Sequence, residues 1–191
     1  ALKGSASTTL KMVKGNNLTG STFVSKEEGA PAFTVGKFVN EDGLGFDFHS
    51  NGYQAAYWDV DKKMPLCNGG KCAYMVALMS VSKVYRVKIC GKAFNDVNSD
   101  GMAGPFFTTE GGNQAVFDAT NNMLTLTNAH IDKTKSDTDD PAIEMGDFTT
   151  GTNSGRATLT INGENHVSGS PSLRTQGNLI ITSATKDFKS I

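Results

Sequence analysis

The oxygen-rich loop at residues 96–101 is the stretch whose residue types and spacing best suit a chemical task. Side-chain oxygens recur at alternate positions, in Asp96, Asn98 and Asp100, and Gly101 follows them. Calcium loops use this spacing because it points three hard oxygen ligands inward and lets the chain turn at the glycine. The position of the closing carboxylate holds Phe107 instead. The pattern leaves two interpretations open: a calcium site, with calcium as the one cofactor, or a turn without metal.

The three cysteines are the second group with chemical potential. Cys67 and Cys72 are separated by four residues, and Cys90 follows later. A zinc ribbon needs paired two-residue spacings and a fourth ligand, so a structural disulfide is the better prediction, with three reduced, buried thiols as the alternative. Cys67 with Cys72 would close a tight loop, whereas Cys72 with Cys90 would join two strands. The sequence does not choose between these pairings.

No motif predicts an enzyme. The three histidines lie far apart in the sequence, and no nucleophile elbow, metalloprotease helix, phosphate loop or dinucleotide fingerprint is present. Asp47 and His49 could join a catalytic group only through folding. Basic patches interleaved with aromatic residues are absent as well, so we expect no nucleic-acid partner. The sequence therefore predicts a protein without catalytic residues.

Composition points to a β-rich domain outside the cytoplasm. The 191 residues suit one domain, and 38% hydrophobic with 19% charged residues leaves much of the chain to turn and strand formers, including 21 glycines. We expect an extracellular, cell-surface or periplasmic location. No apolar run reaches the ~20 residues that a membrane helix needs. Since the chain begins at Ala1, we expect a processed or trimmed form, which would touch a membrane only through a missing N-terminal helix.

Charge is unevenly distributed along the chain. Residues 1–92 carry 12 Lys and Arg against 7 Asp and Glu, which gives +5, and residues 93–191 carry 6 against 12, which gives −6. One interpretation is a mixed solvated surface. The other is a pair of complementary faces through which copies dock head to tail, as in a filament.

The order of predicted elements starts with a helix. Leu2, Ala6, Leu10 and Val13 form one stripe at helical spacing over residues 1–14, and residues 15–32 read as a loop. Residues 73–89 fit either one buried helix or two strands, and their β-branched content favours strands. Asn162 and Gly163 predict a hairpin, and residues 132–140 an exposed charged loop. Further strands are predicted over 33–39, 44–49, 54–60, 114–118, 122–128, 156–161 and 179–182.

Residues 1–14 resemble the exposed end of the long N-terminal helix in bacterial type IV pilins and type II secretion pseudopilins. The resemblance implies a helix packed on an antiparallel sheet or β-sandwich, in a mainly β, α+β, loop-rich head over residues 33–191. It further implies a structural filament subunit whose partners are other copies or related subunits, with Leu2, Ala6, Leu10 and Val13 on the assembly face. The alternative hypothesis is a secreted or cell-surface β-sandwich that binds a ligand, such as a glycan or a protein, beside a calcium-ordered loop.

Overall fold

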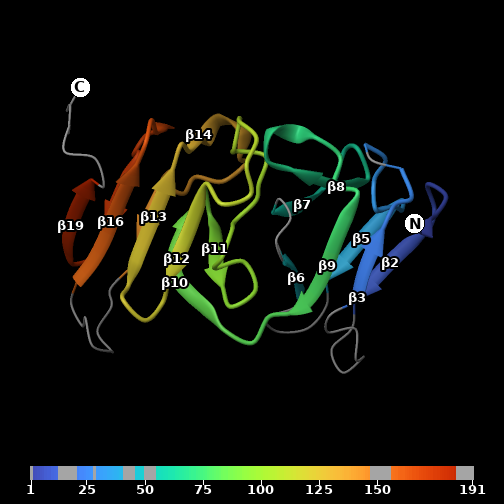
Figure 1. The fold of residues 1–191 in the computed structure, drawn as a ribbon, viewed down its shortest axis with the longest axis horizontal. Coiled ribbons are helices and arrows are strands. Elements are labelled where there is room, and N and C mark those ends of the chain that lie inside the picture. The colour runs from blue at the N-terminus through green and yellow to red at the C-terminus, as the bar shows by residue number, and fades with distance from the viewer. Residues whose placement is uncertain are drawn as a thin grey trace.

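The protein is built almost entirely of β-strands. A computed structural model describes residues 2–12, 21–27, 29–40, 46–49, 55–146 and 156–183. Within these ranges, the only helices are two 3-10 turns, at Asn68–Gly70 and Lys133–Lys135. The strands follow one another along a single long axis, with β2 near one end and β19 at the other (Figure 1). The expectation of a single domain stays a prediction.

The predicted N-terminal helix is wrong. Strands β1 (Leu2–Lys3) and β2 (Thr9–Met12) replace it, joined by a turn. Glycine, serine and threonine dominate residues 4–9, and these residues favour turns and strands over helix interiors. Both strands also find parallel partners, since β1 pairs with β4 (Phe33–Thr34) and β2 with β5 (Lys37–Asn40).

Among the described residues, Leu2, Ala6 and Leu10 therefore do not form a helical stripe, and their role in assembly stays a prediction. Leu2 and Ala6 are exposed on a strand and a turn, while Leu10 packs against a buried cluster. Val13 lies outside the described residues.

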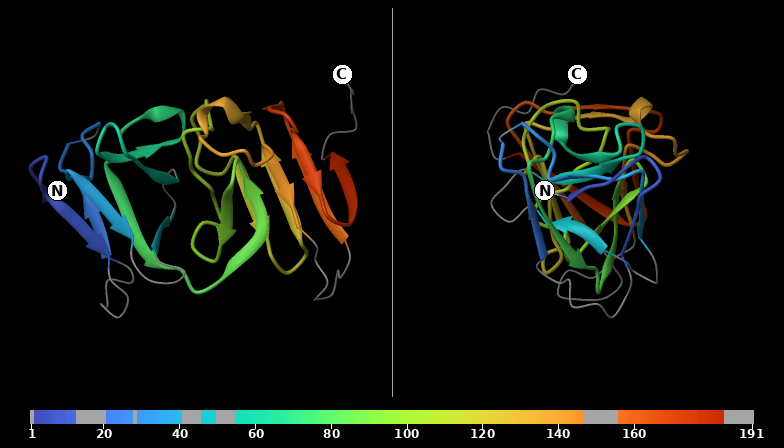
Figure 2. Two further views of the ribbon diagram at one scale, coloured as in Figure 1. Left: turned by 180° about the vertical axis from the view of Figure 1, so that it is seen from behind. Right: turned by 90° about the vertical axis from the view of Figure 1, so that its right-hand side faces the viewer.

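The C-terminal part is a parallel β-solenoid. Each strand pairs in parallel with the strand that occupies the same position in the next coil: β13 with β16 and β16 with β19, β14 with β17, and β15 with β18. These strands are β13 (Met123–Thr127), β14 (His130–Asp132), β15 (Ile143–Met145), β16 (Arg156–Asn162), β17 (His166–Ser168), β18 (Leu173–Thr175) and β19 (Asn178–Ser183). Seen along the axis, strands lie around a shared interior (Figure 2).

The N-terminal part follows a related plan. After β1 and β2 comes β3 (Ser21–Val24), and after β4 and β5 comes β6 (Phe46–His49). Strands β3 and β6 do not pair with each other, because β9 (Met75–Ser80) lies between them and is antiparallel to both. Part of the loop predicted at 15–32 is therefore a strand.

Antiparallel pairs connect the two parts. They comprise β7 (Ala56–Asp59) with β8 (Met64–Cys67), β10 (Val84–Ile89) with β11 (Lys92–Asn95), and β12 (Ala115–Asp118) with β13. The prediction of two strands within residues 73–89 is confirmed by β9 and β10. The predicted antiparallel sheet or β-sandwich is wrong, because the described residues form seven small sheets, several of them parallel.

The predicted hairpin at Asn162 and Gly163 is also wrong. The strands that flank it, β16 and β17, pair with neighbouring coils and not with each other. Gly163 has a positive φ of 69°, as a tight turn requires, but this turn is a coil corner. Asparagines hold the corner: the Asn128 side chain accepts from the Glu164 N–H, and the Asn165 side chain accepts from the Ala129 N–H.

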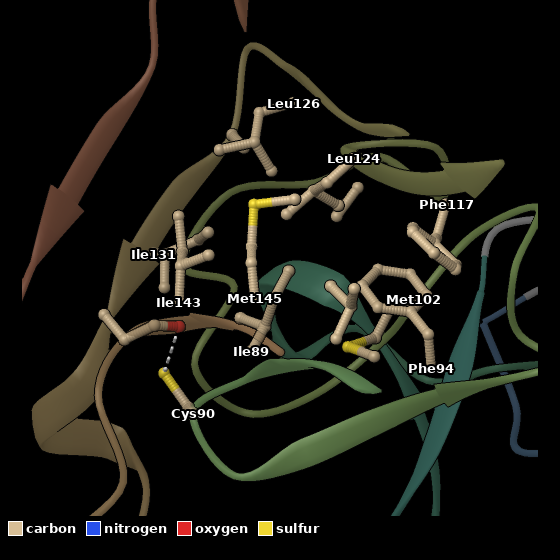
Figure 3. Packing of buried hydrophobic residues seen from close by; sticks show 14 of the residues in the cluster. Ile89, Cys90, Phe94, Met102, Phe117, Leu124, Leu126, Ile131, Ile143 and Met145 are labelled. Carbon is tan, nitrogen blue, oxygen red and sulfur yellow. Dashed lines mark hydrogen bonds between the residues drawn. The ribbon is translucent and has the colours of Figure 1, made fainter. Parts of the chain in front are cut away.

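Two large apolar clusters fill the interior. The cluster of the C-terminal part includes Phe94, Met102, Leu124 and Met145, each fully buried (Figure 3). The cluster of the N-terminal part is centred on Phe33, which is also fully buried. Each such side chain stabilises the fold by roughly 1.5–3 kcal/mol relative to exposure. A third, small cluster lies between them and contains Ala55, Tyr57, Leu66 and Ala103.

The connection between β14 and β15 is much longer than its counterpart in the next coil. It covers residues 133–142, whereas β17 and β18 are joined by residues 169–172. The paired residues on either side stay in register, since Asp132 lies beside Ser168 and Ile143 beside Leu173. Residues 133–142 are thus an expanded turn on a regular coil, and we name them the expanded turn.

Candidate functional site

A cavity lies where the three clusters meet. Its volume is about 500 Å³, inside the range of about 300–1,000 Å³ typical of small-molecule sites. The described lining comes from both parts of the chain and from the expanded turn. It comprises Phe38, Asp47, Phe48, Tyr57, Trp58, Leu78, Cys90, Gly91, Lys92, Ala103, Gly104, Pro105, Phe106, Lys135, Ser136, Asp137 and Thr138.

Aromatic rings form one wall of the cavity. The Trp58 ring stacks on Phe33, with centroids 5.8 Å apart and planes 9° apart, and it contacts Phe38 at 5.4 Å. Phe38 in turn stacks on the buried Phe48 at 5.8 Å. Because each ring is packed against another, the wall is a fixed apolar surface.

The carboxylate of Asp47 is the most connected polar group of the cavity. One oxygen accepts hydrogen bonds from the side-chain amides of Asn95 (2.8 Å) and Asn98 (3.0 Å). The other accepts from the Phe48 N–H at 2.8 Å and lies 3.6 Å from the Lys92 ammonium. Asp47 stands on β6, whereas its other partners belong to β11 and the turn after it. The carboxylate therefore joins the N-terminal part to the middle of the chain.

Lys92 and Tyr57 bring hydrogen-bonding capacity to the cavity. The Lys92 ammonium donates to the Ala103 carbonyl at 3.0 Å and faces Asp47, so one of its three N–H donors is left. Tyr57 is 9% exposed, and its hydroxyl has no hydrogen-bond partner in the described part of the chain. Burial, and to a lesser extent Asp59 and Cys67, raises the pKa of Tyr57 to about 12, so the phenol stays neutral.

The rim of the cavity is supplied by the expanded turn. The hydroxyls of Ser136 (3.0 Å) and Thr138 (3.3 Å) both donate to the Cys90 carbonyl, which anchors the turn. Lys135, Asp137 and Thr138 are exposed, as the sequence predicted for this loop. The loop was not predicted to form part of a site, and no local pattern marks it as one.

The anchoring point of the rim is a tight turn between β10 and β11. Cys90 and Gly91 both have positive φ, 48° and 81°, and such a pair matches the twist of a two-residue hairpin. The Cys90 thiol points into the C-terminal cluster and donates to the Ala142 carbonyl at 3.8 Å (Figure 3). Burial raises the pKa of Cys90 to about 11, so this thiol is not a reactive thiolate at neutral pH.

The three predicted calcium ligands have different surroundings in the structure. Asp96 accepts from the backbone of Ser82 and Lys83 and from the Ser82 hydroxyl. Partial burial opposes these bonds, yet together they lower the pKa of Asp96. The Asn98 oxygen accepts from the Asn95 N–H, while Asp100 is exposed. No group of three or more His, Cys, Asp or Glu within the described ranges is placed to hold a metal, and calcium binding stays a prediction.

All three cysteines are free thiols in this structure. Cys72 lies opposite Leu66 in an antiparallel bridge, and adjacent strand residues point to opposite faces. Cys67 accordingly packs with the N-terminal cluster and Cys72 with the small third cluster. Cys90 belongs to the C-terminal cluster. A disulfide from Cys72 to either partner would need a local rearrangement, and the pairing stays a prediction.

The acidic residues of the second half of the sequence gather in its first part, and docking through complementary faces stays a prediction. Residues 93–147 hold 10 Asp and Glu against 2 Lys and Arg, whereas residues 156–183 hold Arg156, Arg174 and Glu164. The acidic excess therefore lies near the middle of the chain and not on the last coil. In the described ranges, no helix is long and apolar enough to cross a membrane.

No family model, curated protein or solved structure matches the chain. The fold and the cavity alone define the class of protein: a β-solenoid with a candidate site where its two parts meet.

Proposed function

We propose that this protein is a ligand-binding module, and that the cavity between the clusters holds a small, uncharged molecule. One observation carries the proposal: the Asp47 carboxylate, the Lys92 ammonium and the rim hydroxyls are already fixed by bonds to the protein before any ligand arrives. Asp47 is held by two amides, a backbone N–H and Lys92, and the rim is tied to Cys90. Sites fixed in this way lose little entropy on binding.

The shape of the cavity supports the same function. Its floor is buried, with Phe48, Tyr57, Leu78 and Phe106 contributing apolar surface, and its rim is exposed. Small-molecule sites combine an apolar lining with a few oriented polar groups in this manner. We propose that the module acts without catalysis, outside the cytoplasm, and that calcium at Asp96, Asn98 and Asp100 adds rigidity beside the Asp47 network.

The filament hypothesis has lost the helix on which it rested, because the described residues 2–12 form two strands and a turn. The ligand-binding alternative is the one that the cavity favours.

The test uses two neutral probes that combine an apolar face with one hydroxyl, cyclohexanol and benzyl alcohol. Trp58 is the single tryptophan of the chain and lines the cavity, so its emission reports on this site. We expect at least one probe to raise the Tm and to shift the Trp58 emission saturably. Thr138→Phe, which places a ring at the rim, should abolish both effects.

The matched control is Thr120→Phe, at an exposed turn outside the cavity. It should bind the probe as the unsubstituted protein does. No response from the unsubstituted protein, or equal loss in both variants, would refute the proposal.

A further inference from the structure

The charges around the cavity cancel. Among its described lining residues, Asp47 and Lys92 lie on the floor and Lys135 and Asp137 on the rim, two negative and two positive groups. An ionic ligand at the floor would have to displace Asp47 or Lys92 from their ion pair or remain without a counter-charge, and burying an unpaired charge is costly. The cavity therefore favours a ligand without net charge.

Hydrogen-bonding groups lie on both sides of the cavity. Lys92 keeps one N–H donor, and the Tyr57 hydroxyl can donate or accept. On the rim, the hydroxyls of Ser136 and Thr138 give their protons to Cys90 and keep lone pairs that can accept. A ligand that uses these groups must carry several hydroxyls or amides, some donating and some accepting.

The aromatic wall adds a third requirement. Trp58, Phe38 and Phe48 offer a flat apolar surface next to the polar groups. A ligand that satisfies both needs a C–H face of its own beside its hydroxyls. Sugar rings have this character, because their ring hydrogens gather on one face while hydroxyls project from the edge.

Resting on the proposed function, we infer that the ligand of the cavity is a neutral carbohydrate, with a ring against the Trp58 wall and its hydroxyls at Lys92, Tyr57 and the expanded turn.

The experiment titrates the intact chain with four neutral disaccharides: cellobiose, maltose, lactose and N,N′-diacetylchitobiose. Binding is followed by calorimetry and by Trp58 emission. We expect at least one disaccharide to bind saturably and to shift the emission. Trp58→Ala should weaken that binding at least about tenfold, as truncating a central aromatic contact does. Trp58→Phe should keep most of it.

Charge variants test the polar half of the inference. Lys92→Met removes a charged donor and leaves Asp47 unbalanced, so disaccharide affinity should fall at least about tenfold. Lys135→Met, at the exposed rim, makes the same charge change without touching the floor and should weaken binding less. Lys62→Met is exposed, lies outside the cavity, and should change nothing.

The outcomes separate this inference from the proposed function. If cyclohexanol or benzyl alcohol binds and no disaccharide does, the carbohydrate is refuted and the binding module stands. If neither kind of probe binds, both proposals fall. If the calorimetric heat of disaccharide binding is unchanged in Trp58→Ala and in Thr138→Phe, the sugar binds elsewhere and the assignment is refuted.

Discussion

Replacing Asp47 by alanine should destabilise the protein and make its two parts unfold less cooperatively. The change removes the acceptor of the Asn95 and Asn98 amides, and both of these residues are buried, at 7% and 1% exposure. Each buried donor left without a partner costs about 1–3 kcal/mol, and Lys92 loses its counter-charge as well. We expect the free energy of unfolding to fall by about 3–5 kcal/mol, the range for breaking a buried charged network.

Urea unfolding with two signals measures the effect. Trp58 emission reports on the N-terminal part, and far-UV circular dichroism reports on all strands. In Asp47→Ala, the Trp58 transition should move to lower urea than the circular dichroism transition, because the link between the parts is gone. Asn98→Ala should then cost less in the Asp47→Ala background than alone, by the contribution of the one bond that the two residues share, since the Asn98 bonds to Asn95 and Ala93 remain.

Asp118 offers the matched control. Its carboxylate also accepts three hydrogen bonds, from the Thr120 and Asn121 backbone and the Asn121 side chain, but at a surface turn. Asp118→Ala should cost about 1 kcal/mol or less. If Asp47→Ala costs no more than this control, or if the two unfolding signals stay together, the proposed linking role of Asp47 is wrong.

Three other measurements address separate features. Burial raises the pKa of the Cys67 and Cys90 thiols from 9.0 to about 11. The contribution of the two neutral, buried thiols to the free energy of unfolding is therefore fully present below pH 9 and is lost as the pH rises through 11. Between pH 7 and 10 the two thiols together should lower the free energy of unfolding by about 3 kcal/mol in reducing urea titrations, and Cys67→Ala with Cys90→Ala should flatten this dependence; an equally steep slope in the double variant would contradict it. Gly36→Ala would place a Cβ against the Ala6 carbonyl and should lower the free energy of unfolding by about 1–3 kcal/mol, whereas Gly70→Ala meets open space and should cost only about 1 kcal/mol for its positive φ; equal costs would show that the close approach does not matter. Calcium added to chelator-stripped protein should give calorimetric heat that Asp96→Ala with Asp100→Ala abolishes, and no heat from the unsubstituted protein would remove that site.

Strands could be predicted where alternation is strong, and the N-terminal helix could not be excluded by spacing alone. Residues 156–161 alternate apolar and polar side chains, and β16 lies there. Leu2 and Leu10 share a helical spacing, yet they belong to two strands with different partners. The spacing of the apolar residues fits a helix, but the backbone between Leu2 and Leu10 is rich in glycine and serine and forms a turn.

The solenoid and its cavity were beyond prediction for a different reason. Met123 pairs with Thr158 and Thr158 with Ile180, offsets of 35 and 22 residues, so the coils do not produce a repeat of fixed length. The cavity brings Asp47 and Trp58 together with Lys92 and Asp137, from segments that no local pattern connects. Asp47 was visible only as a carboxylate near His49. Its hydrogen-bond partners Asn95 and Asn98 come close to it only because strands distant in the sequence lie together in the fold.

The expanded turn has a consequence for how such a protein can diversify. Residues 133–142 and residues 169–172 span the same pair of neighbouring ladders, so the backbone ladder tolerates either length. Insertions, deletions and substitutions at this point would alter the rim of the cavity while leaving the paired strands on either side in register. The rim can therefore vary in length and sequence without any change in the residues that pair one coil with the next.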